Sequence, residues 1–191
     1  MLRGLVFACA LLPLMAVANP ELTLEPQAKK KKKGFGIGLD VSAFFPSDRD
    51  IVRAFAAANY GIGLSPTNIN FRPGTHFIWD IGLNGDSRAG SRYFTVAPTF
   101  GVIYSPQNED SQSTFRPYFA ARVGPYYADY SILRNNTRFK DRGFGWNGNV
   151  EAGLFLTDKI RVSVRYDKFS EKDGFDLGGL RAGVTWQFLR F

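Results

Sequence analysis

The amino-acid sequence predicts an all-β protein, a closed antiparallel up-and-down transmembrane β-barrel of about eight strands. Apolar and polar residues alternate with a period of two through successive segments, as in strands with two different faces. The 191 residues include 20 Gly and 18 Phe, a composition that suits strands and tight turns better than helices. After the N-terminus no segment has the roughly 18 consecutive apolar residues of a membrane helix, and a closed barrel is the other structure that satisfies every backbone group in a bilayer.

Residues 1–18 have the pattern of a secretory signal peptide. A short basic start precedes an apolar run at residues 4–17, and Ala16 and Ala18 form a small-x-small site that predicts cleavage after Ala18. The run is shorter than the roughly 20 residues of a membrane anchor. Because Cys9 lies inside this segment, the mature chain is expected to have no cysteine and no disulfide.

Residues 19–34 are polar and contain five consecutive lysines at 29–33. We interpret this segment as a periplasmic linker, whose lysines either attract anionic phosphate groups of the membrane or form a solvated spacer. The formal net charge is +7; without these lysines and Arg3 it falls to about +1. The remaining chain is nearly neutral, so the charge gives no indication of a nucleic-acid partner.

Residues 35–191 contain the alternating segments. The eight predicted strands cover residues 36–45, 59–71, 77–84, 93–104, 115–132, 146–156, 160–167 and 177–191. The four connections expected outside the cell are residues 46–58, 85–90, 134–142 and 170–176. The first of these contains a short helix that Ser47 and Asp50 are expected to cap. Pro98, Pro117 and Pro125 fall inside predicted strands and predict bulges or early strand ends.

Charged residues collect on one face of the predicted strands. This face carries four carboxylates and four arginines: Asp40, Asp80, Arg122, Glu151, Arg161, Arg165, Asp167 and Arg181. In a membrane barrel such charges face the lumen and must be paired. An eight-stranded barrel is just wide enough to be filled by side chains, so the equal numbers of opposite charges predict a plugged lumen.

Aromatic residues lie on the opposite, apolar face toward the strand ends, as in interfacial girdles. They are Tyr104, Trp146, Tyr166, Trp186 and Phe188. A secreted soluble barrel would also show the alternation, and the placement of these aromatic residues favours the membrane.

The signal peptide, the alternating hairpins and the terminal Phe191 together resemble the small bacterial outer-membrane β-barrel proteins, the OmpA-like, OmpW-like and opacity-type group. The resemblance covers about residues 34–191, and residues 186–191 are similar to the C-terminal signal that the barrel-assembly machinery reads. One departure is that the apolar face runs through Trp186 and Phe188, which leaves Phe191 out of phase. A bulge or a frayed end would restore the alternation.

The resemblance implies an exported monomer in the outer membrane. Its implied partners are outer-membrane lipids, lipopolysaccharide, the barrel-assembly machinery and periplasmic chaperones. Four basic residues of the predicted third outer connection, Arg134, Arg138, Lys140 and Arg142, either contact lipopolysaccharide phosphates or simply keep that loop solvated.

No catalytic, cofactor or metal site is expected from the sequence. His76 is the only histidine and lies beside a predicted turn at the periplasmic end, away from the outer leaflet. A single histidine without cysteine disfavours zinc, and Gly36 and Gly38 belong to a strand that no helix follows, unlike a dinucleotide fingerprint.

The leading functional hypothesis is therefore a non-enzymatic barrel that serves envelope structure or surface-loop interactions. The alternatives are a narrow channel for small hydrophobic or polar solutes, a barrel-embedded lipid-modifying enzyme and the secreted soluble barrel.

Overall fold

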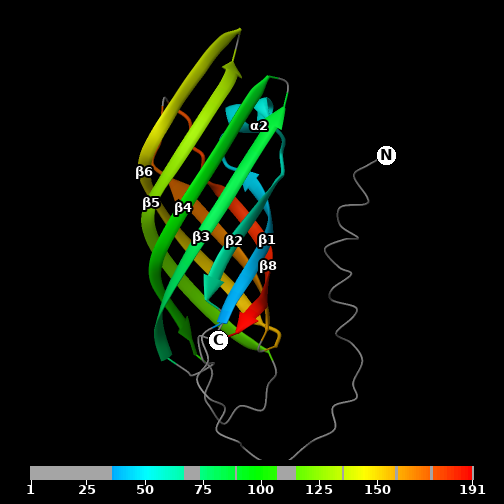
Figure 1. Ribbon diagram of the computed structural model, residues 1–191, viewed down its shortest axis with the longest axis vertical. Coiled ribbons are helices and arrows are strands. Elements are labelled where there is room, and N and C mark those ends of the chain that lie inside the picture. Colours follow the sequence, from blue (N-terminus) through cyan, green and yellow to red (C-terminus); the bar gives the residue numbers. More distant parts are fainter. Residues whose placement is uncertain are drawn as a thin grey trace, which may run out of the picture. The chain divides into compact units, whose positions relative to one another are not determined.

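The computed structural model contains an eight-stranded antiparallel barrel, closed by pairing of the first strand with the last (Figure 1). It describes residues 36–66, 74–88, 90–106, 115–134, 136–157, 159–172 and 174–190. The strands are β1 (Gly36–Pro46), β2 (Asn59–Pro66), β3 (Gly74–Arg88), β4 (Ser91–Ser105), β5 (Arg116–Arg134), β6 (Thr137–Phe155), β7 (Ile160–Phe169) and β8 (Gly179–Arg190), with a helix α2 (Arg49–Ala54) after β1. Each strand pairs with its sequence neighbours, so the predicted up-and-down barrel is confirmed.

The two ends of the barrel differ. One end holds Gly36 paired with Arg190, and we call it the terminal end. The opposite end, which we call the lid end, holds α2 and the β3–β4 and β5–β6 turns (Figure 1). The predicted signal peptide and lysine-rich linker lie outside the described residues. Within the described residues no helix is long and apolar enough to cross a membrane.

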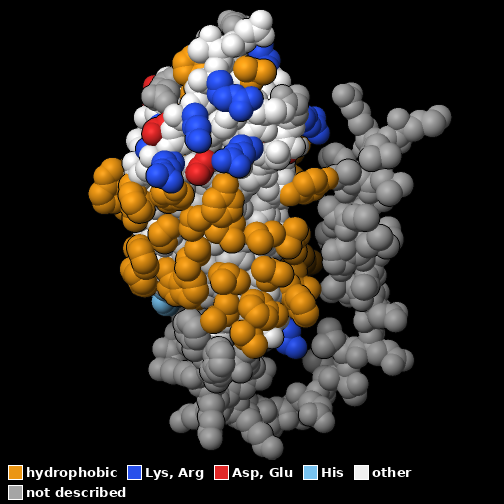
Figure 2. All heavy atoms as spheres, turned by 45° about the horizontal axis from the view of Figure 1, so that its top comes forward, with side chains coloured by type: hydrophobic (Ala, Val, Ile, Leu, Met, Phe, Trp, Pro, Cys, Tyr) orange, Lys and Arg blue, Asp and Glu red, His pale blue; other side chains and the backbone are white. Residues whose placement is uncertain are grey.

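Apolar side chains cover the outside of the barrel. Figure 2 shows them as a band, with lysine and arginine side chains gathered beyond its edge toward the lid end. Val123 and Val150 are each 59% exposed and Trp146 is 67% exposed, although all three lie in regular strands. Large apolar side chains are therefore turned outward while charges are buried, the reverse of a water-soluble protein and the arrangement of a membrane barrel.

The helix α2 is capped by Asp48 and not by Ser47, which corrects the sequence prediction. The Asp48 carboxylate accepts hydrogen bonds from the backbone N–H groups of Asp50 (2.7 Å) and Ile51 (3.4 Å). It also accepts the N–H of Asp176 at 3.0 Å, so one carboxylate ties the helix to the segment before β8. The backbone N–H of Ser47 donates to Gly178 O at 2.9 Å. We call these two joined segments, residues 47–58 and 170–178, the lid.

Two of the predicted outer loops are in fact strand. β3 and β4 continue to Arg88 and Ser91, and β5 and β6 continue to Arg134 and Thr137. The turns between them contain only two residues each, with Gly90 and Asn136 at positive φ (80° and 62°). The predictions of loops at 85–90 and 134–142 are therefore wrong.

The reason is an inversion of the alternation near the lid end. In this part of β5 the inward residues are apolar, as at Tyr130 and Ile132, and the outward residues are polar, as at Asp129. Outside the bilayer nothing favours an apolar outer face, so a polar strand resembles a loop in sequence.

The prolines interrupt pairing without ending the strands. Pro98 and Pro125 lie opposite each other in β4 and β5, where the pairing stops after Val96↔Tyr127 and resumes at Phe100↔Val123 in the same register. A proline has no backbone N–H to donate to the neighbouring strand. Because the two prolines lie opposite each other, the missing hydrogen bonds between β4 and β5 are confined to one site. Pro117 pairs with Leu154 near the start of β5. The second strand ends at Pro66, short of the predicted residue 71, and residues 67–71 lie outside the described residues.

A register shift lies in the last strand. Ile37 of β1 pairs with Leu189, but the next residue, Gly38, pairs with Gln187, so Phe188 is the extra residue of a bulge. As a result Phe188 (45% exposed) and Leu189 (41% exposed) both face outward. Of the two expected ways to accommodate the out-of-phase C-terminus, a bulge or a frayed end, the structure shows a bulge; Phe191 itself lies outside the described residues.

Candidate functional site

The lumen is the place where the strands bring polar and aromatic side chains together, and it has three layers. An aromatic layer lies at the lid end, a charged layer lies in the middle, and a smaller apolar layer lies toward the terminal end. This layering decides what the barrel interior can do.

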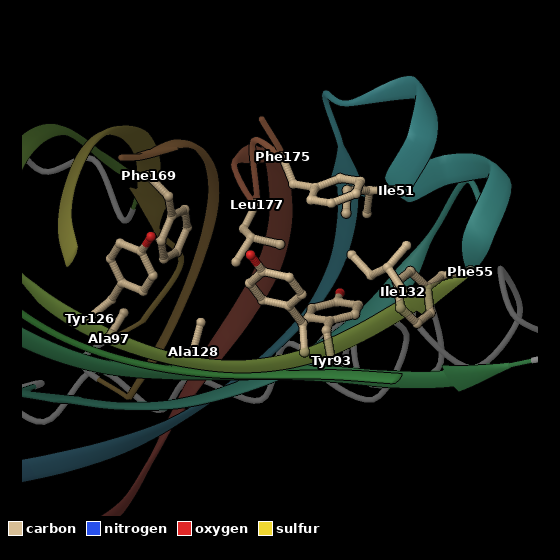
Figure 3. Packing of buried hydrophobic residues seen from close by; sticks show 11 residues of the cluster. Ile51, Phe55, Tyr93, Ala97, Tyr126, Ala128, Ile132, Phe169, Phe175 and Leu177 are labelled. Carbon is tan, nitrogen blue, oxygen red and sulfur yellow. The ribbon is translucent and has the colours of Figure 1, made fainter. Parts of the chain in front are cut away.

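The lid-end layer joins the lid to the barrel wall. Figure 3 shows Ile51 and Phe55 on one side and Phe175 on the other, pointing into the same cluster. The Phe55 and Tyr93 rings meet edge to face at 4.8 Å between centroids, and so do those of Tyr126 and Phe169. The buried members of this layer are Ile51, Phe55, Tyr93, Ala97, Tyr126, Ala128, Tyr130, Ile132, Phe169, Phe175 and Leu177. Packed rings thus occupy the interior at this end.

The structure places all eight charged residues of the sequence prediction in the middle layer. Each is at most 7% exposed: Asp40, Asp80, Arg122, Glu151, Arg161, Arg165, Asp167 and Arg181. They come from six strands and form three connected groups, with equal numbers of acids and arginines.

The first group joins β5 and β6. The Nη1 and Nη2 atoms of Arg122 each lie 3.0 Å from Oε2 of Glu151, and Nη1 also donates to Oδ1 of Asn149 at 2.9 Å. The other carboxylate oxygen, Oε1, accepts the hydroxyl of Tyr118 at 2.5 Å. Both Glu151 oxygens are therefore hydrogen-bonded, as a buried carboxylate requires.

The second group is a chain of alternating charge. Arg165 lies 3.2 Å from Oδ1 of Asp80 through Nη1 and 3.2 Å from Oδ1 of Asp167 through Nε. Oδ2 of Asp167 accepts a hydrogen bond from Nε of Arg181 at 3.1 Å. The Nη1 atom of Arg181 donates a second one to Ser42 Oγ, also at 3.1 Å. This chain links β3, β7, β8 and β1 across the lumen.

In the third group the charges meet through a hydroxyl. Arg161 Nε donates to Thr185 Oγ1 at 3.0 Å, and the same hydroxyl donates to Oδ2 of Asp40 at 3.0 Å. Arg161 Nη2 donates to Ser65 Oγ at 2.6 Å, and the guanidinium lies 5.9 Å from the centroid of the Tyr118 ring.

The terminal end carries the third layer. Its buried members are Ile78, Ile103, Tyr118, Ala120 and Phe155. The Tyr118 and Phe155 rings lie 4.7 Å apart, so Tyr118 packs in this layer while its hydroxyl reaches the charged one. His76 is half-buried in β3 and pairs with Ile103 in the same row.

Glycines on the inner face make room for the large side chains. A Cβ at Gly61 would overlap Arg181 Nη1 and Asn84 Oδ1, and a Cβ at Gly153 would lie 2.6 Å from the Cζ and Oη atoms of Tyr118. Arginine and tyrosine therefore lie over strand glycines, which explains part of the high glycine content.

The five aromatic residues of the sequence prediction lie outside. All are exposed on the outer face: Tyr104, Trp146, Tyr166, Trp186 and Phe188. Tyr104, Trp186 and Phe188 lie toward the terminal end. Trp146 lies toward the lid end, where its backbone N–H and C=O bond Ser170.

Sequence reasoning missed the aromatic layer and the hydroxyl partners. Tyr126 and Tyr130 are four residues apart within a long tyrosine-rich segment, and this even spacing places both on one face of a strand without indicating which face is inside. The hydroxyls of Ser42, Tyr118 and Thr185 could have been found by extending the charged face to its polar members.

In chemical terms the eight charges of the middle layer are balanced. Every carboxylate of this layer has an arginine or a hydroxyl partner. Among the described residues no group of three His, Cys, Asp or Glu side chains is arranged to hold a metal ion.

A closed strand barrel with an apolar exterior and a charge-paired interior defines the class of small integral membrane β-barrels. The chain matches the outer membrane protein beta-barrel domain family over residues 7–188, and it belongs to that family. The predicted resemblance to small outer-membrane barrels is thereby confirmed, and the family supports the outer-membrane location. No curated protein matches the sequence.

Solved structures share the fold at low sequence identity. Ail, the attachment invasion locus protein of Yersinia pestis, is 9% identical, with 81% of this chain and 97% of Ail covered and a TM-score of 0.52. Neisserial surface protein A is 19% identical, with 81% and 97% covered and a TM-score of 0.49. The outer membrane enzyme PagL is 18% identical, with 80% and 99% covered and a TM-score of 0.49. The likeness to Ail concerns the fold alone.

Proposed function

We propose that this protein is a non-enzymatic component of the outer membrane, a rigid barrel with a plugged lumen that serves envelope structure and presents its lid end to the exterior. The observation that carries this proposal is the stacking of three layers of buried side chains in the lumen. An open pore needs a continuous polar path, and here a charged layer, whose members form ion pairs or meet through a hydroxyl, lies between two clusters of buried apolar and aromatic side chains.

The same layers argue against the alternatives. A channel for small hydrophobic solutes needs an apolar interior, whereas eight charged side chains lie in the middle of this one. A lipid-modifying enzyme needs a nucleophile and a base near the lipid, whereas His76 lies in the inward row at the terminal end. In the proposed orientation this end faces the periplasm.

Conductance and fractionation test the proposal together. The protein is expected in the outer-membrane fraction, with heat-modifiable gel mobility and no steady openings in planar bilayers. The variant Tyr126→Ala/Phe169→Ala removes two rings of the lid-end layer. We expect it not to conduct, because the charged layer below would still block the lumen. Steady high-conductance openings of the wild-type protein would overturn the plug, and recovery in the soluble periplasm would overturn the membrane assignment.

A further inference from the structure

The register of β3 to β6 produces a polar row on the outer face near the lid end. Ser87 pairs with Arg92, Arg92 with Ser131, and Ser131 with Lys140, so one row crosses four strands as Ser–Arg–Ser–Lys. Arg138 lies two residues beyond Lys140 on β6 and therefore faces the same side. What the sequence suggested was a basic loop is a regular array of cations on a rigid sheet.

Two of the carboxylates near the lid end face inward, while the cations of the row face outward. Asp86 and Asp141 lie in the inward row that also contains Tyr93, and Asp141 Oδ2 lies 3.6 Å from Nζ of Lys172 in the lid. Asp141 is flanked in sequence by Lys140 and Arg142, yet the strand turns these two cations outward. The outer face is left with an excess of positive charge.

A groove lies along this row, where the β5–β6 hairpin continues past the β3–β4 turn. It has a volume of about 260 Å³ and is lined by Ser87, Gly90, Ser91, Arg92, Ser131, Arg138 and Lys140. Nη2 of Arg138 lies 3.9 Å from the place that a Cβ on Gly90 would take, so this guanidinium leans across the groove to the turn. Three cations and three hydroxyls line it, and no carboxylate does.

A neighbouring hollow is less suited to an anion. Its volume is about 410 Å³, and its lining adds Asp129 and Asp141 to three basic residues. Carboxylates would repel a phosphate there, so the groove lined only by cations and hydroxyls is the better site.

The position of the groove along the barrel axis also suits a lipid headgroup. The next outward row toward the terminal end contains Phe94, Asp129 and Arg142, and the row after that contains Tyr127 and Phe144, whose rings lie 5.4 Å apart. Phe144 is 77% exposed, as expected for a ring at a membrane interface. Two rows are about 13 Å along a strand, which puts the cations at the level of lipid headgroups.

We propose that this groove binds a phosphate group on the saccharide headgroup of an outer-leaflet glycolipid, a phosphorylated lipid A, whose acyl chains would lie along the aromatic rows below. Arg92 and Arg138 offer the paired N–H groups that match phosphate oxygens, Lys140 adds a point charge, and Ser87 adds a hydroxyl. The proposal rests on the membrane orientation given above and names a ligand for its outer face.

The test measures lipid A binding to the refolded full-length protein by native mass spectrometry. Bisphosphorylated lipid A should bind at least tenfold more tightly than the same lipid after phosphatase treatment. The variant Arg92→Ser/Arg138→Ser/Lys140→Ser should lose that preference. The matched control Arg49→Ser/Arg53→Ser/Lys159→Ser removes the same charge from exposed positions elsewhere and should keep it. Lys140→Ser alone, the mildest change, should weaken the preference in part.

The outcomes separate the two proposals. If the wild-type protein does not insert into lipid vesicles, the membrane assignment and the site both fail. If it inserts but binds both forms of lipid A equally, or if the triple variant keeps the preference, the site alone is wrong. Tighter binding of a soluble heparin oligosaccharide than of bisphosphorylated lipid A would identify a soluble polyanion as the ligand and would overturn the lipid assignment.

Discussion

Arg122 and Glu151 form a doubly hydrogen-bonded ion pair between β5 and β6, with both terminal guanidinium nitrogens 3.0 Å from one carboxylate oxygen. The two side chains are 0% and 3% exposed. At this depth neither charge has access to bulk water, so each depends on the other. The pair also connects two layers of the lumen, because the Tyr118 hydroxyl bonds the same carboxylate from the terminal-end layer.

Replacing Glu151 by Gln should destabilise the barrel by about 3 kcal/mol or more, since it leaves a buried arginine without its counter-charge. The measurement is urea unfolding in lipid vesicles, followed by tryptophan fluorescence. Glu171→Gln is the matched control, because Glu171 is 64% exposed and its contact with Lys168 is 3.9 Å long. The control should leave the midpoint unchanged.

A double-mutant cycle sharpens this prediction. Arg122→Ala with Glu151→Ala should be less destabilised than the sum of the two single variants, because the double variant leaves no unpaired charge. Additive losses would mean that the two residues act independently, which would contradict the paired plug.

The close contact between Gly153 and Tyr118 yields a second prediction. Gly153→Ala puts a methyl group 2.5 Å from the backbone oxygen of Val162 and 2.6 Å from the ring and hydroxyl of Tyr118, and it should cost about 1–3 kcal/mol through overpacking. Gly148 lies in the same strand, and a Cβ there would meet only Arg122 O, at 3.9 Å. Gly148→Ala is therefore the control and should be close to neutral in the same unfolding experiment. Equal effects of the two changes would show that glycine matters in β6 for chain flexibility rather than for room.

The Asp48 side chain should stabilise the lid without affecting the stability of the barrel strands. Its carboxylate accepts two N–H groups of the helix start and the N–H of Asp176, so Asp48→Ala removes the cap and the tie between the two halves of the lid. We expect loss of about 1–2 kcal/mol of local stability. Amide exchange should become faster in residues 47–58 and 170–178 and stay unchanged in the strands.

Arg53→Ala on the same helix provides the comparison for this experiment. Its side chain is 78% exposed, and its ion pair with Asp50 is 3.6 Å long. Exchange in the lid should stay at the wild-type rate. If Asp48→Ala accelerated exchange throughout the strands, the lid would be part of the barrel's cooperative unit and not a separate cover.

The fold could be predicted from sequence because, within the bilayer, two simple requirements coincide. Lipid demands an apolar residue at every second position, and a narrow lumen demands small or paired polar residues between them. Asp167 and Arg165 could therefore be assigned to the inner face from alternation alone. The bulge at Phe188 could be anticipated as well, because Phe191 is out of phase with Trp186.

Beyond the bilayer the same reasoning failed for a physical reason. At residues 85–90 and 134–142 the outer face meets water and the inner face meets the lid. The apolar residues therefore face inward and the polar residues outward, and the difference in polarity between the two faces is smaller. Lys140 and Arg142 thus looked like loop residues. The pairing partners within the charged layer were also beyond prediction, because Ser65 and Arg161 meet only when strands 96 residues apart in sequence face each other across the lumen.

The strongest test of the membrane assignment is a charge on the outer wall. Val150 is 59% exposed and lies between Phe144 and Leu154, the outermost exposed apolar residues of β6, with Ala121 and Tyr166 beside it on the neighbouring strands. If this wall faces hydrocarbon, Val150→Arg should cost about 2–4 kcal/mol in vesicle unfolding experiments, because the guanidinium must be carried to the bilayer midplane. If the wall faced water, an arginine at so exposed a position would cost almost nothing. Thr137→Arg, at the exposed start of the same strand beyond the apolar band, supplies the reference and should be neutral in both cases. A large difference between the two arginine variants in vesicles therefore requires hydrocarbon at Val150, and equal stabilities would return the chain to the soluble class.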